Sequence, residues 1–179
     1  MASDEELAHA LQRGDATALE ELVTRYYAPL LRFLFRMTGG HQSDAEDLLQ
    51  ETCVRMMCGI QSYSPARPFK PWLYTIARNV AYNYMARAEQ RQSTGSLPEA
   101  AASPQALPEE RLVMREQRSS IMQALAQLPV KQREAIILFY YDELPQKEIA
   151  ALLHIPVGTV KSRLSLGLRQ LRHWLKEHI

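Results

Sequence analysis

Residues 69–87 read FKPWLYTIARNVAYNYMAR and combine aromatic with basic side chains. The stretch holds five aromatic residues and three basic ones, with no acidic residue among them. Single-stranded nucleic acid exposes base faces, which stack on aromatic rings, and phosphates, which attract Arg and Lys. A helix that only fills a core does not need these charges, and a helix that only faces water does not need these rings. From residue types alone, single-strand binding and ordinary packing explain the stretch equally well.

The polar residues of this stretch are closely spaced. Four side chains lie within about one and a half helical turns of one another, namely Arg78, Asn79, Tyr82 and Asn83. The amide of an asparagine can hydrogen-bond the edge of a base. Helical spacing also predicts a buried stripe, made of Leu73, Ile76, Ala77, Val80 and Tyr84. Trp72 belongs in part to the same core, so only some of the aromatic rings are free for bases.

A second candidate site lies in PQKEIAALLHIPVGTVKSRLSLGLRQL, residues 145–171. The pattern predicts a short helix, a tight turn and a longer helix, which is a helix-turn-helix. Ala150 is small enough to lie where the two helices cross. The apolar wedge between them is predicted to contain Ile149, Leu153, Ile155 and Val160.

The longer of these two helices has one apolar and one basic face. Counted at about 100° per residue, one stripe contains Val160, Leu164, Leu168, Leu171 and Leu175. The opposite side contains Lys161, Ser165, Arg169, Arg172 and Lys176. Residues 156–176 carry five basic side chains and no acid, whereas a face that is merely solvated normally mixes both signs. This pattern favours contact with duplex DNA.

A third pattern is acidic and lies in SDAEDLLQETCVRMM, residues 43–57. Asp44, Asp47 and Glu51 recur at i, i+3 and i+7, so they line one helix face. Carboxylates in a first turn stabilise the helix dipole, and Arg55 is placed to pair with Glu51. Local structure therefore accounts for most of the pattern. What remains is consistent with an acidic surface for a basic protein partner.

The elements that position these sites are all predicted to be helical. An amphipathic helix spans residues 16–37 and ends at Gly39 and Gly40. Ser43 and Glu46 then form a predicted capping box for a helix that reaches about Cys58. After the break SYSPARP, the next helix has Pro71 in its first turn.

A segment rich in Pro, Ser and Ala separates two domains. Residues 92–111 have no periodicity and are predicted to be a flexible linker. Helical spacing resumes at Leu112 and is interrupted at Leu128–Pro129, at Leu144–Pro145 and at His154–Ile155–Pro156. We therefore predict an all-α chain with two small helical domains, residues 1–91 and 112–179, the second containing the helix-turn-helix.

The charge of the chain is segregated. The net charge is +1 over 179 residues, but it is −5 for residues 1–66, +4 for 67–91, −2 for 92–116 and +4 for 117–179. Two basic blocks indicate two anion-binding surfaces. The acidic start MASDEELAHAL lacks a long apolar run, so we expect neither a signal peptide nor a membrane span. Cys53 and Cys58 cannot bridge at helical spacing, and we expect them to be buried thiols of a cytoplasmic protein.

Three motifs in this order resemble a known family: DAEDLLQET, FKPWLYTIARNVAYNY and LPVKQREAIILFYYDELPQKEIAALLHIPVGTVKSRL. The chain is similar over nearly its whole length to the extracytoplasmic-function sigma factors of bacteria. Such a protein is not an enzyme. The resemblance implies that it binds core RNA polymerase, recognises the −10 and −35 promoter elements and helps to open the duplex.

The resemblance also implies a role for each motif. The core-binding helix corresponds to the stretch with Asp44, Asp47, Leu48, Gln50 and Glu51. The segment that captures the single strand of the −10 element corresponds to the stretch with Phe69, Lys70, Trp72, Arg78, Asn79, Tyr82, Asn83 and Arg87. The loop from Ser62 to Pro68 corresponds to the specificity loop of the family. Extruding a base breaks its stacking, and pocket and phosphate contacts offset that loss.

The C-terminal domain resembles the reader of the duplex −35 element. The side chains implied to lie near the major groove are Thr159, Lys161, Ser162, Arg163, Ser165 and Arg169. Leu166 and Gly167 depart from the aromatic or basic residues that relatives often carry there. We expect fewer base contacts from the middle of this helix and a larger share from DNA shape. Gly167 also lowers helix stability by roughly 1 kcal/mol relative to Ala, and the sequence shows no compensating feature.

Signatures of catalysis are missing from the sequence, which lacks GxSxG, HExxH and P-loop motifs. We expect no cofactor and no bound metal. The alternatives are a stand-alone regulator that binds duplex DNA without polymerase and, more distantly, an RNA-binding or antitermination protein. A plain repressor needs neither the acidic helix nor the basic aromatic one. The resemblance implies an anti-sigma factor as a further partner. The sequence identifies neither that partner, nor the promoter, nor how the two domains are placed in the free protein.

Overall fold

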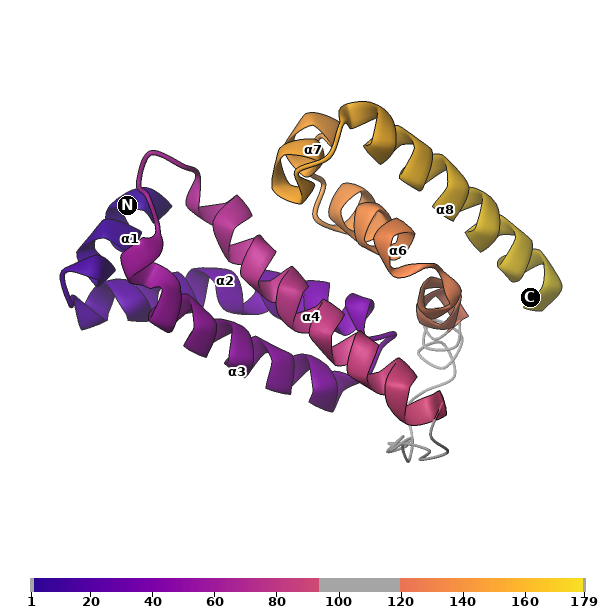
Figure 1. Cartoon of the computed structure of the whole chain (residues 1–179), viewed down its shortest axis with the longest axis horizontal. Helices are drawn as coiled ribbons and strands as arrows, with labels where there is room; N and C mark the ends of the chain where they lie inside the picture. Colours follow the sequence, from indigo (N-terminus) through magenta and orange to yellow (C-terminus); the bar gives the residue numbers. More distant parts are fainter. Residues whose placement is uncertain (1, 94–119, 179) are drawn as a thin grey trace, which may run out of the picture.

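The computed structural model describes residues 2–93 and 120–178, and every regular element within these ranges is helical (Figure 1). This confirms the predicted fold class for the described residues. The predicted linker falls almost entirely outside them. Helices α1 to α4 form the N-terminal domain, and helical residues 120–127 with α6 to α8 form the C-terminal domain. None of the described helices is both long and apolar enough to cross a membrane.

The chain begins with a helix that the sequence analysis did not predict. Helix α1 spans Asp4–Gln12, and Ser3 caps it. The Ser3 hydroxyl accepts a hydrogen bond from the Glu6 amide at 3.1 Å, and the Glu6 carboxylate accepts one from the Ser3 amide at 2.7 Å. This reciprocal pair is a capping box. The sequence Ser-x-x-Glu before Leu7 was the signal that would have predicted the helix.

Helix α2 spans Ala16–Met37, as predicted. Asp15 caps its start by accepting a hydrogen bond from the Thr17 amide at 2.9 Å. Gly39 and Gly40 follow its end with φ of +75° and +94°. L residues with a side chain rarely adopt these values, which explains why two glycines stop the helix.

Helix α3 spans Gln42–Gly59, and its predicted capping box is wrong. The N-cap residue is His41, which makes no side-chain capping bond, and Ser43 lies inside the first turn. Glu46 instead accepts a hydrogen bond from the Gln42 side chain at 2.6 Å. The prediction that both cysteines are buried is also wrong, because Cys58 is exposed near the C-terminal end of the helix. A one-turn helix, η1, covers Ile60–Ser62 and leads into the loop before α4.

Helix α4 spans Phe69–Ser93 and packs against α1, α2 and α3. In the C-terminal domain, α6 spans Val130–Ile136, and a π-helical turn, η2, covers Ile137–Tyr141. Helix α7 spans Gln146–Leu153, and α8 spans Val157–His178. A proline directly precedes each of α6, α7 and α8. Proline suits a helix start because its missing N–H would have no intrahelical partner there. The predicted interruptions are therefore confirmed.

Helices α7 and α8 form the predicted helix-turn-helix. The turn passes through His154, whose φ of 52° lies in the left-handed region. The wedge residues Ile149, Leu153 and Val160 are buried, and Ile155 packs against them from a partly exposed position.

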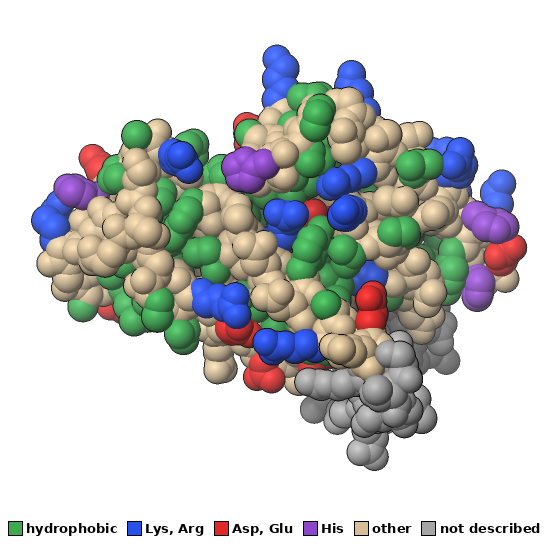
Figure 2. Space-filling model, viewed as in Figure 1, with side chains coloured by type: hydrophobic (Ala, Val, Ile, Leu, Met, Phe, Trp, Pro, Cys, Tyr) green, Lys and Arg blue, Asp and Glu red, His purple; other side chains and the backbone are tan. Residues whose placement is uncertain are grey.

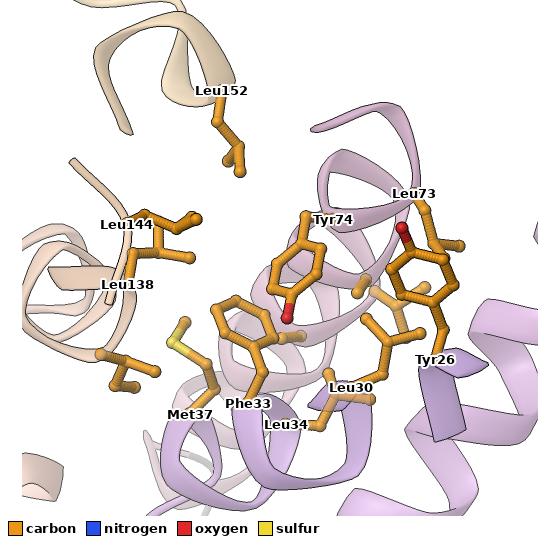
Figure 3. Close-up of a cluster of buried hydrophobic side chains, with 14 of the residues drawn as sticks. Tyr26, Leu30, Phe33, Leu34, Met37, Leu73, Tyr74, Leu138, Leu144 and Leu152 are labelled. Atoms are coloured by element: carbon orange, nitrogen blue, oxygen red, sulfur yellow. The ribbon is translucent and has the colours of Figure 1, made fainter. Parts of the chain in front are cut away.

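The two domains share one hydrophobic cluster. Leu138, Leu144 and Leu152 of the C-terminal domain face Met37, Phe33 and Tyr74 of the N-terminal domain (Figure 3). Their side chains are all buried. Removing this much apolar surface from water stabilises the packed arrangement. The relative placement of the domains, which the sequence left open, is thus a closed one in which the C-terminal domain covers part of α2 and α4.

Candidate nucleic-acid interface

Helix α4 is covered on two sides. Leu73, Ala77 and Val80 are buried, as predicted, whereas Ile76 and Tyr84 of the predicted stripe are only partly buried. Tyr74 and Ala81 are buried as well, which the simple stripe did not include. The additional coverage comes from the C-terminal domain, because α7 packs against α4. A single-stripe analysis cannot anticipate a second covered face.

One line of polar side chains on α4 faces solvent. Asn79, Asn83 and Arg87 are all exposed and recur every four residues. This spacing places them along one face of the helix. The structure therefore brings together three of the predicted −10 residues as a continuous polar strip, which we call the α4 strip.

Arg78 and Tyr82, beside the α4 strip, are held by the C-terminal domain. The Arg78 guanidinium lies 2.8 Å from the Glu134 carboxylate of α6, measured from Nε to Oε1. The Tyr82 hydroxyl donates a hydrogen bond to the other Glu134 oxygen at 2.7 Å. The guanidinium also lies 4.9 Å from the centre of the Tyr82 ring, within cation–π range. Two donors thus converge on one carboxylate, and the geometry is that of an anion-binding pair.

Glu134 is 0% exposed, which makes it an unusual glutamate. Burial raises the pKa of its carboxyl group, while Arg78, Tyr82 and Arg163 act in the opposite direction. Arg163 comes from α8, so a single carboxylate interacts with an arginine from each predicted DNA-binding helix. Burial and Glu134 together raise the pKa of Tyr82 to about 12, so the phenol stays protonated and donates its hydrogen bond.

Phe69, at the start of α4, is not placed to contact DNA. It is 0% exposed and packs edge-on against Tyr26 and Tyr63, with ring centroids 5.7 Å and 5.5 Å away. The prediction that Phe69 binds the −10 element is therefore corrected, because in this structure the residue has a structural role. Trp72 belongs in part to this aromatic cluster, as expected, with its centroid 5.5 Å from that of Phe69. Lys70 is half-buried, with its ammonium 5.7 Å from the Tyr74 ring centre.

The predicted DNA-binding face of α8 is more exposed than that of α4. Four of the six predicted residues are exposed, namely Lys161, Ser162, Ser165 and Arg169. Thr159 and Arg163 are partly buried, the latter because it lies towards Glu134. Lys and Arg side chains project from the edges of the molecule formed by the C-terminal helices (Figure 2). A basic, accessible helix after a tight turn is the geometry that enters a major groove.

The structure supplies the reason for Gly167. A Cβ atom at this position would lie 2.6 Å from Cδ1 of Ile136 on α6, well inside van der Waals contact. Ile136 is itself buried and has little room to move. Glycine therefore permits the close approach of α6 and α8, which offsets its low helix propensity.

The acidic face of α3 is only partly available to a partner. Asp47 and Gln50 are exposed, but Arg55 binds Glu51 at 2.6 Å. Asp44 accepts a hydrogen bond from the Tyr84 hydroxyl at 2.6 Å. Leu48 is 5% exposed and belongs to the core, so its predicted role in contacting polymerase directly is corrected to a structural one.

Two apolar residues extend this face and were missed by the sequence analysis. Val54 is 58% exposed and Met57 is 49% exposed. With Asp47 and Gln50 they recur at i, i+3, i+7 and i+10, which places all four on one side of α3. Their apolar character at positions opposite the buried stripe was the available signal. We call these four residues the α3 face.

No group of three or more metal-ligating side chains occurs among residues 2–93 and 120–178.

Comparison with known proteins identifies both domains. Residues 22–91 match the family Sigma-70 region 2, and residues 118–171 match the family Sigma-70, region 4. The chain is similar to the ECF RNA polymerase sigma factor SigW of Bacillus subtilis (strain 168). The two are 34% identical over 176 residues, which cover 93% of this chain and 94% of the relative.

Two solved structures resemble the whole arrangement. CnrH in complex with the cytosolic domain of CnrY has a TM-score of 0.73 and 25% identity, covering 98% of this chain and 99% of that one. The sigma factor RpoE of Bartonella quintana, in complex with the anti-sigma factor NepR, has a TM-score of 0.68 and 29% identity. That match covers 88% of this chain and 96% of the other.

Proposed function

The chain belongs to the extracytoplasmic-function (ECF) family of RNA polymerase sigma factors, and we propose that α3, α4 and α8 divide its work between polymerase, the −10 strand and the −35 duplex. It is an alternative sigma factor for promoter recognition and transcription initiation, with core RNA polymerase and promoter DNA as partners. The main support for these separate roles is the exposed α4 strip, which lies beside the anion-binding pair Arg78 and Tyr82. A regulator that only binds duplex DNA has no use for such a helix.

Helix α4 is the element that holds the single strand of the −10 element. Asn79 and Asn83 are exposed and carry amides that can bond base edges, and Arg87 extends the strip with a charge for phosphate. Arg78 and Tyr82 already bind a carboxylate and offer the same donors to a phosphate oxygen. They become available only after α6 has moved away from α4.

Helix α8 is the element that reads the −35 duplex. Lys161 and Ser162 lie in its first turns and Arg169 lies further along, all exposed. The N-terminal part of a recognition helix contacts base edges, and basic residues along it contact phosphates. Because Leu166 is apolar and Gly167 packs against α6, the middle of the helix contributes little to base reading.

The α3 face is the surface that docks on core polymerase. Asp47 provides a negative charge, while Val54 and Met57 provide apolar area that remains in water in the free chain. A partner surface with basic and apolar side chains would match both properties. The protein performs no covalent step itself, since polymerase synthesises the RNA. It acts in the cytoplasm, where its polymerase and promoters are. An anti-sigma factor is a further partner, supported by the two sigma/anti-sigma complexes that the fold resembles.

Core binding by an Asp47→Lys variant tests the proposal. Charge reversal on the α3 face should weaken the affinity for core polymerase about fivefold to tenfold, because like charges meet at the interface. Binding is measured by fluorescence anisotropy of the labelled chain titrated with core polymerase. Glu20→Lys, an exposed site on α2, is the matched control and should bind as the wild type does. Equal affinities for the two folded variants would remove α3 from the polymerase interface.

A further inference from the structure

Helix α1 lies outside residues 22–91, which match the Sigma-70 region 2 family. It packs against η1 and α4, on either side of the exposed loop that joins α3 to α4. The loop, residues 62–68, is the segment that we expect to contact −10 bases. The contacts between α1 and the two ends of this loop are polar and specific.

Gln12, the last residue of α1, holds the start of the loop. Its side-chain Nε2 donates hydrogen bonds to the Ile60 carbonyl at 2.8 Å and to the Tyr63 carbonyl at 2.7 Å. In return, the Gln61 side chain donates to the Gln12 carbonyl at 3.0 Å. Both amide hydrogens of Gln12 are thus used to fix the turn η1 and the residue that follows it.

Glu5, in the first turn of α1, holds the end of the loop. Its Oε1 accepts a hydrogen bond at 3.0 Å from the backbone amide of Phe69, the first residue of α4. Amides in the first turn of a helix have no intrahelical acceptor, and a carboxylate there also favours the helix dipole. Glu5 and Gln12 are seven residues apart, so they lie on the same face of α1.

Between these two anchors, the loop is exposed and makes contacts within itself. Tyr63 and Phe69 are buried and their rings touch, while residues 64–68 all face solvent. The Tyr63 hydroxyl donates a hydrogen bond across the loop to the Arg67 carbonyl. Pro65 and Pro68 restrict the backbone further. The exposed groups of the loop are therefore presented in one arrangement, and α1 fixes both of its ends.

We propose that α1 sets the base preference at the −10 element, with Gln12 and Glu5 as positioning residues that hold the loop for single-stranded bases. This inference rests on the proposed function, because it assumes that α4 and its loop bind the −10 strand. A donor or acceptor discriminates between bases only when it is held in a defined place, since a mobile loop lets the wrong base find a partner too.

The positioning role can be separated from the packing of α1. Leu7 and Ala8 are buried in the core, and Asp4 binds both Arg25 and Tyr26. These contacts do not involve Gln12. Helix α1 therefore stays docked when the Gln12 amide is removed, and only the loop loses its anchor.

The test compares Gln12→Met, which keeps the length of the side chain but loses both donors, with the wild type. Gln123→Met, at an exposed glutamine of the C-terminal domain, is the matched control. Each protein is assembled with core polymerase and transcribes a promoter library with a fixed −35 element and randomised −10 bases. Sequencing the transcripts gives the preference at each base. We expect Gln12→Met to weaken the preference at one or more −10 positions by about threefold to tenfold, with core affinity and −35 dependence unchanged.

Three further variants keep the outcome interpretable. Gln61→Ala removes the return bond from an exposed residue and should weaken the same preferences to a smaller extent. Glu5→Gln retains an acceptor for the Phe69 amide and should preserve them, whereas Glu5→Met should not. Unchanged −10 preferences in folded Gln12→Met and Gln61→Ala would overturn the positioning role. If the wild type itself shows no −10 preference, the proposed function of α4 fails instead, which is a different result.

Discussion

The two helices of the proposed nucleic-acid interface, α4 and α8, differ in how much of their proposed binding surface is exposed. On α8, Lys161, Ser165 and Arg169 face solvent. On α4, Arg78 and Tyr82 bind the buried carboxylate of Glu134. The surface that we propose to read the duplex is therefore largely accessible in the free chain, whereas the surface that we propose to hold the single strand is partly occupied by the chain's own C-terminal domain.

The closed arrangement and the proposed capture of a single strand therefore compete for the same hydrogen-bond donors. The Arg78 guanidinium and the Tyr82 hydroxyl cannot bind Glu134 and a phosphate group at once. Other contacts favour the closed arrangement: Arg133 donates a hydrogen bond to the Met37 carbonyl at 2.6 Å, and Arg36 lies 4.0 Å from the Tyr141 ring centre. Strand capture through all of α4 thus requires the domains to separate. DNA binding by the exposed residues of α8 does not require the domains to separate.

Reversing the charge at Glu134 should have the largest effect on this comparison. In Glu134→Lys, a buried ammonium would face Arg78 and Arg163, so the closed arrangement should be lost and α4 exposed. Breaking a buried pair in this way typically costs a few kcal/mol, so we expect the free chain to bind a short labelled single strand of random sequence about a hundredfold more tightly.

Two variants control for charge and folding. Glu148→Lys makes the same change in net charge at an exposed site of α7, and it should raise the affinity only slightly. Glu134→Gln keeps the shape of the side chain and should give an intermediate increase. An equal increase in Glu134→Lys and Glu148→Lys, with native helicity by circular dichroism, would show that Glu134 does not block α4.

Asn79→Ala should have the next largest effect, and it is specific to α4. Loss of an amide that bonds a base edge leaves its partner unpaired, which should lower open-complex yield about tenfold. The closed complex should form normally, because single-strand contacts arise only after the duplex melts. Permanganate footprinting on duplex and pre-melted templates measures this, and the pre-melted template should not restore the yield fully. Normal opening of the duplex by folded Asn79→Ala would show that Asn79 does not bind the single strand.

Lys161→Ala should have a smaller effect, confined to α8. We expect the affinity for a duplex −35 fragment to fall about threefold to fivefold, with a shallower dependence on salt if the lost contact is to phosphate. Arg172→Ala, further along the same exposed side, is the control and should change the affinity less. Fluorescence anisotropy at a series of salt concentrations measures the affinity of both variants and its dependence on salt. If Arg172→Ala has the greater effect, the DNA contacts lie nearer the C-terminal end of α8 than proposed.

Asp142→Asn should have the smallest effect, which is a change in the pH dependence of thermal stability. Burial raises the pKa of its carboxyl group from 3.8 to about 6, against the opposing charges of Arg36, Lys70 and Arg32. Because the folded state holds this proton more tightly than the unfolded state, its contribution to stability is fully present below 3.8 and is lost as the pH rises through about 6. In Asp142→Asn this part of the pH dependence of Tm should disappear, and each kcal/mol corresponds to roughly 2–4 °C. If Tm depends on pH in this variant as it does in the wild type, the pH dependence arises from other groups, such as Glu134.

Local signals in the sequence were sufficient for most of the fold. Helix α2 and the interruptions before α6, α7 and α8 follow from glycines and prolines whose backbone preferences act within a few residues. The same holds for the helix-turn-helix and for the exposure of Asn79, Asn83 and Arg87. Prediction failed at the start of α3: Ser43 and Glu46 have the spacing of a capping box, but the N-cap residue is His41, two positions before Ser43, and neither Ser43 nor Glu46 caps the helix.

The helical class, the two basic helices and the order of the domains could be predicted from the sequence, because periodicity, charge and turn residues are properties of neighbours along the chain. Which of the basic residues are exposed depends on contacts between distant parts of the chain. Glu134 lies 56 residues after Arg78, and nothing local to either residue indicates that they meet. The same is true of Gly167, where Ile136 on another helix leaves no room for a side chain. It is also true of Gln12, whose hydrogen-bond partners are Ile60 and Tyr63. Such contacts depend on how packed helices bring distant side chains within hydrogen-bonding or van der Waals distance, and that information exists only in three dimensions.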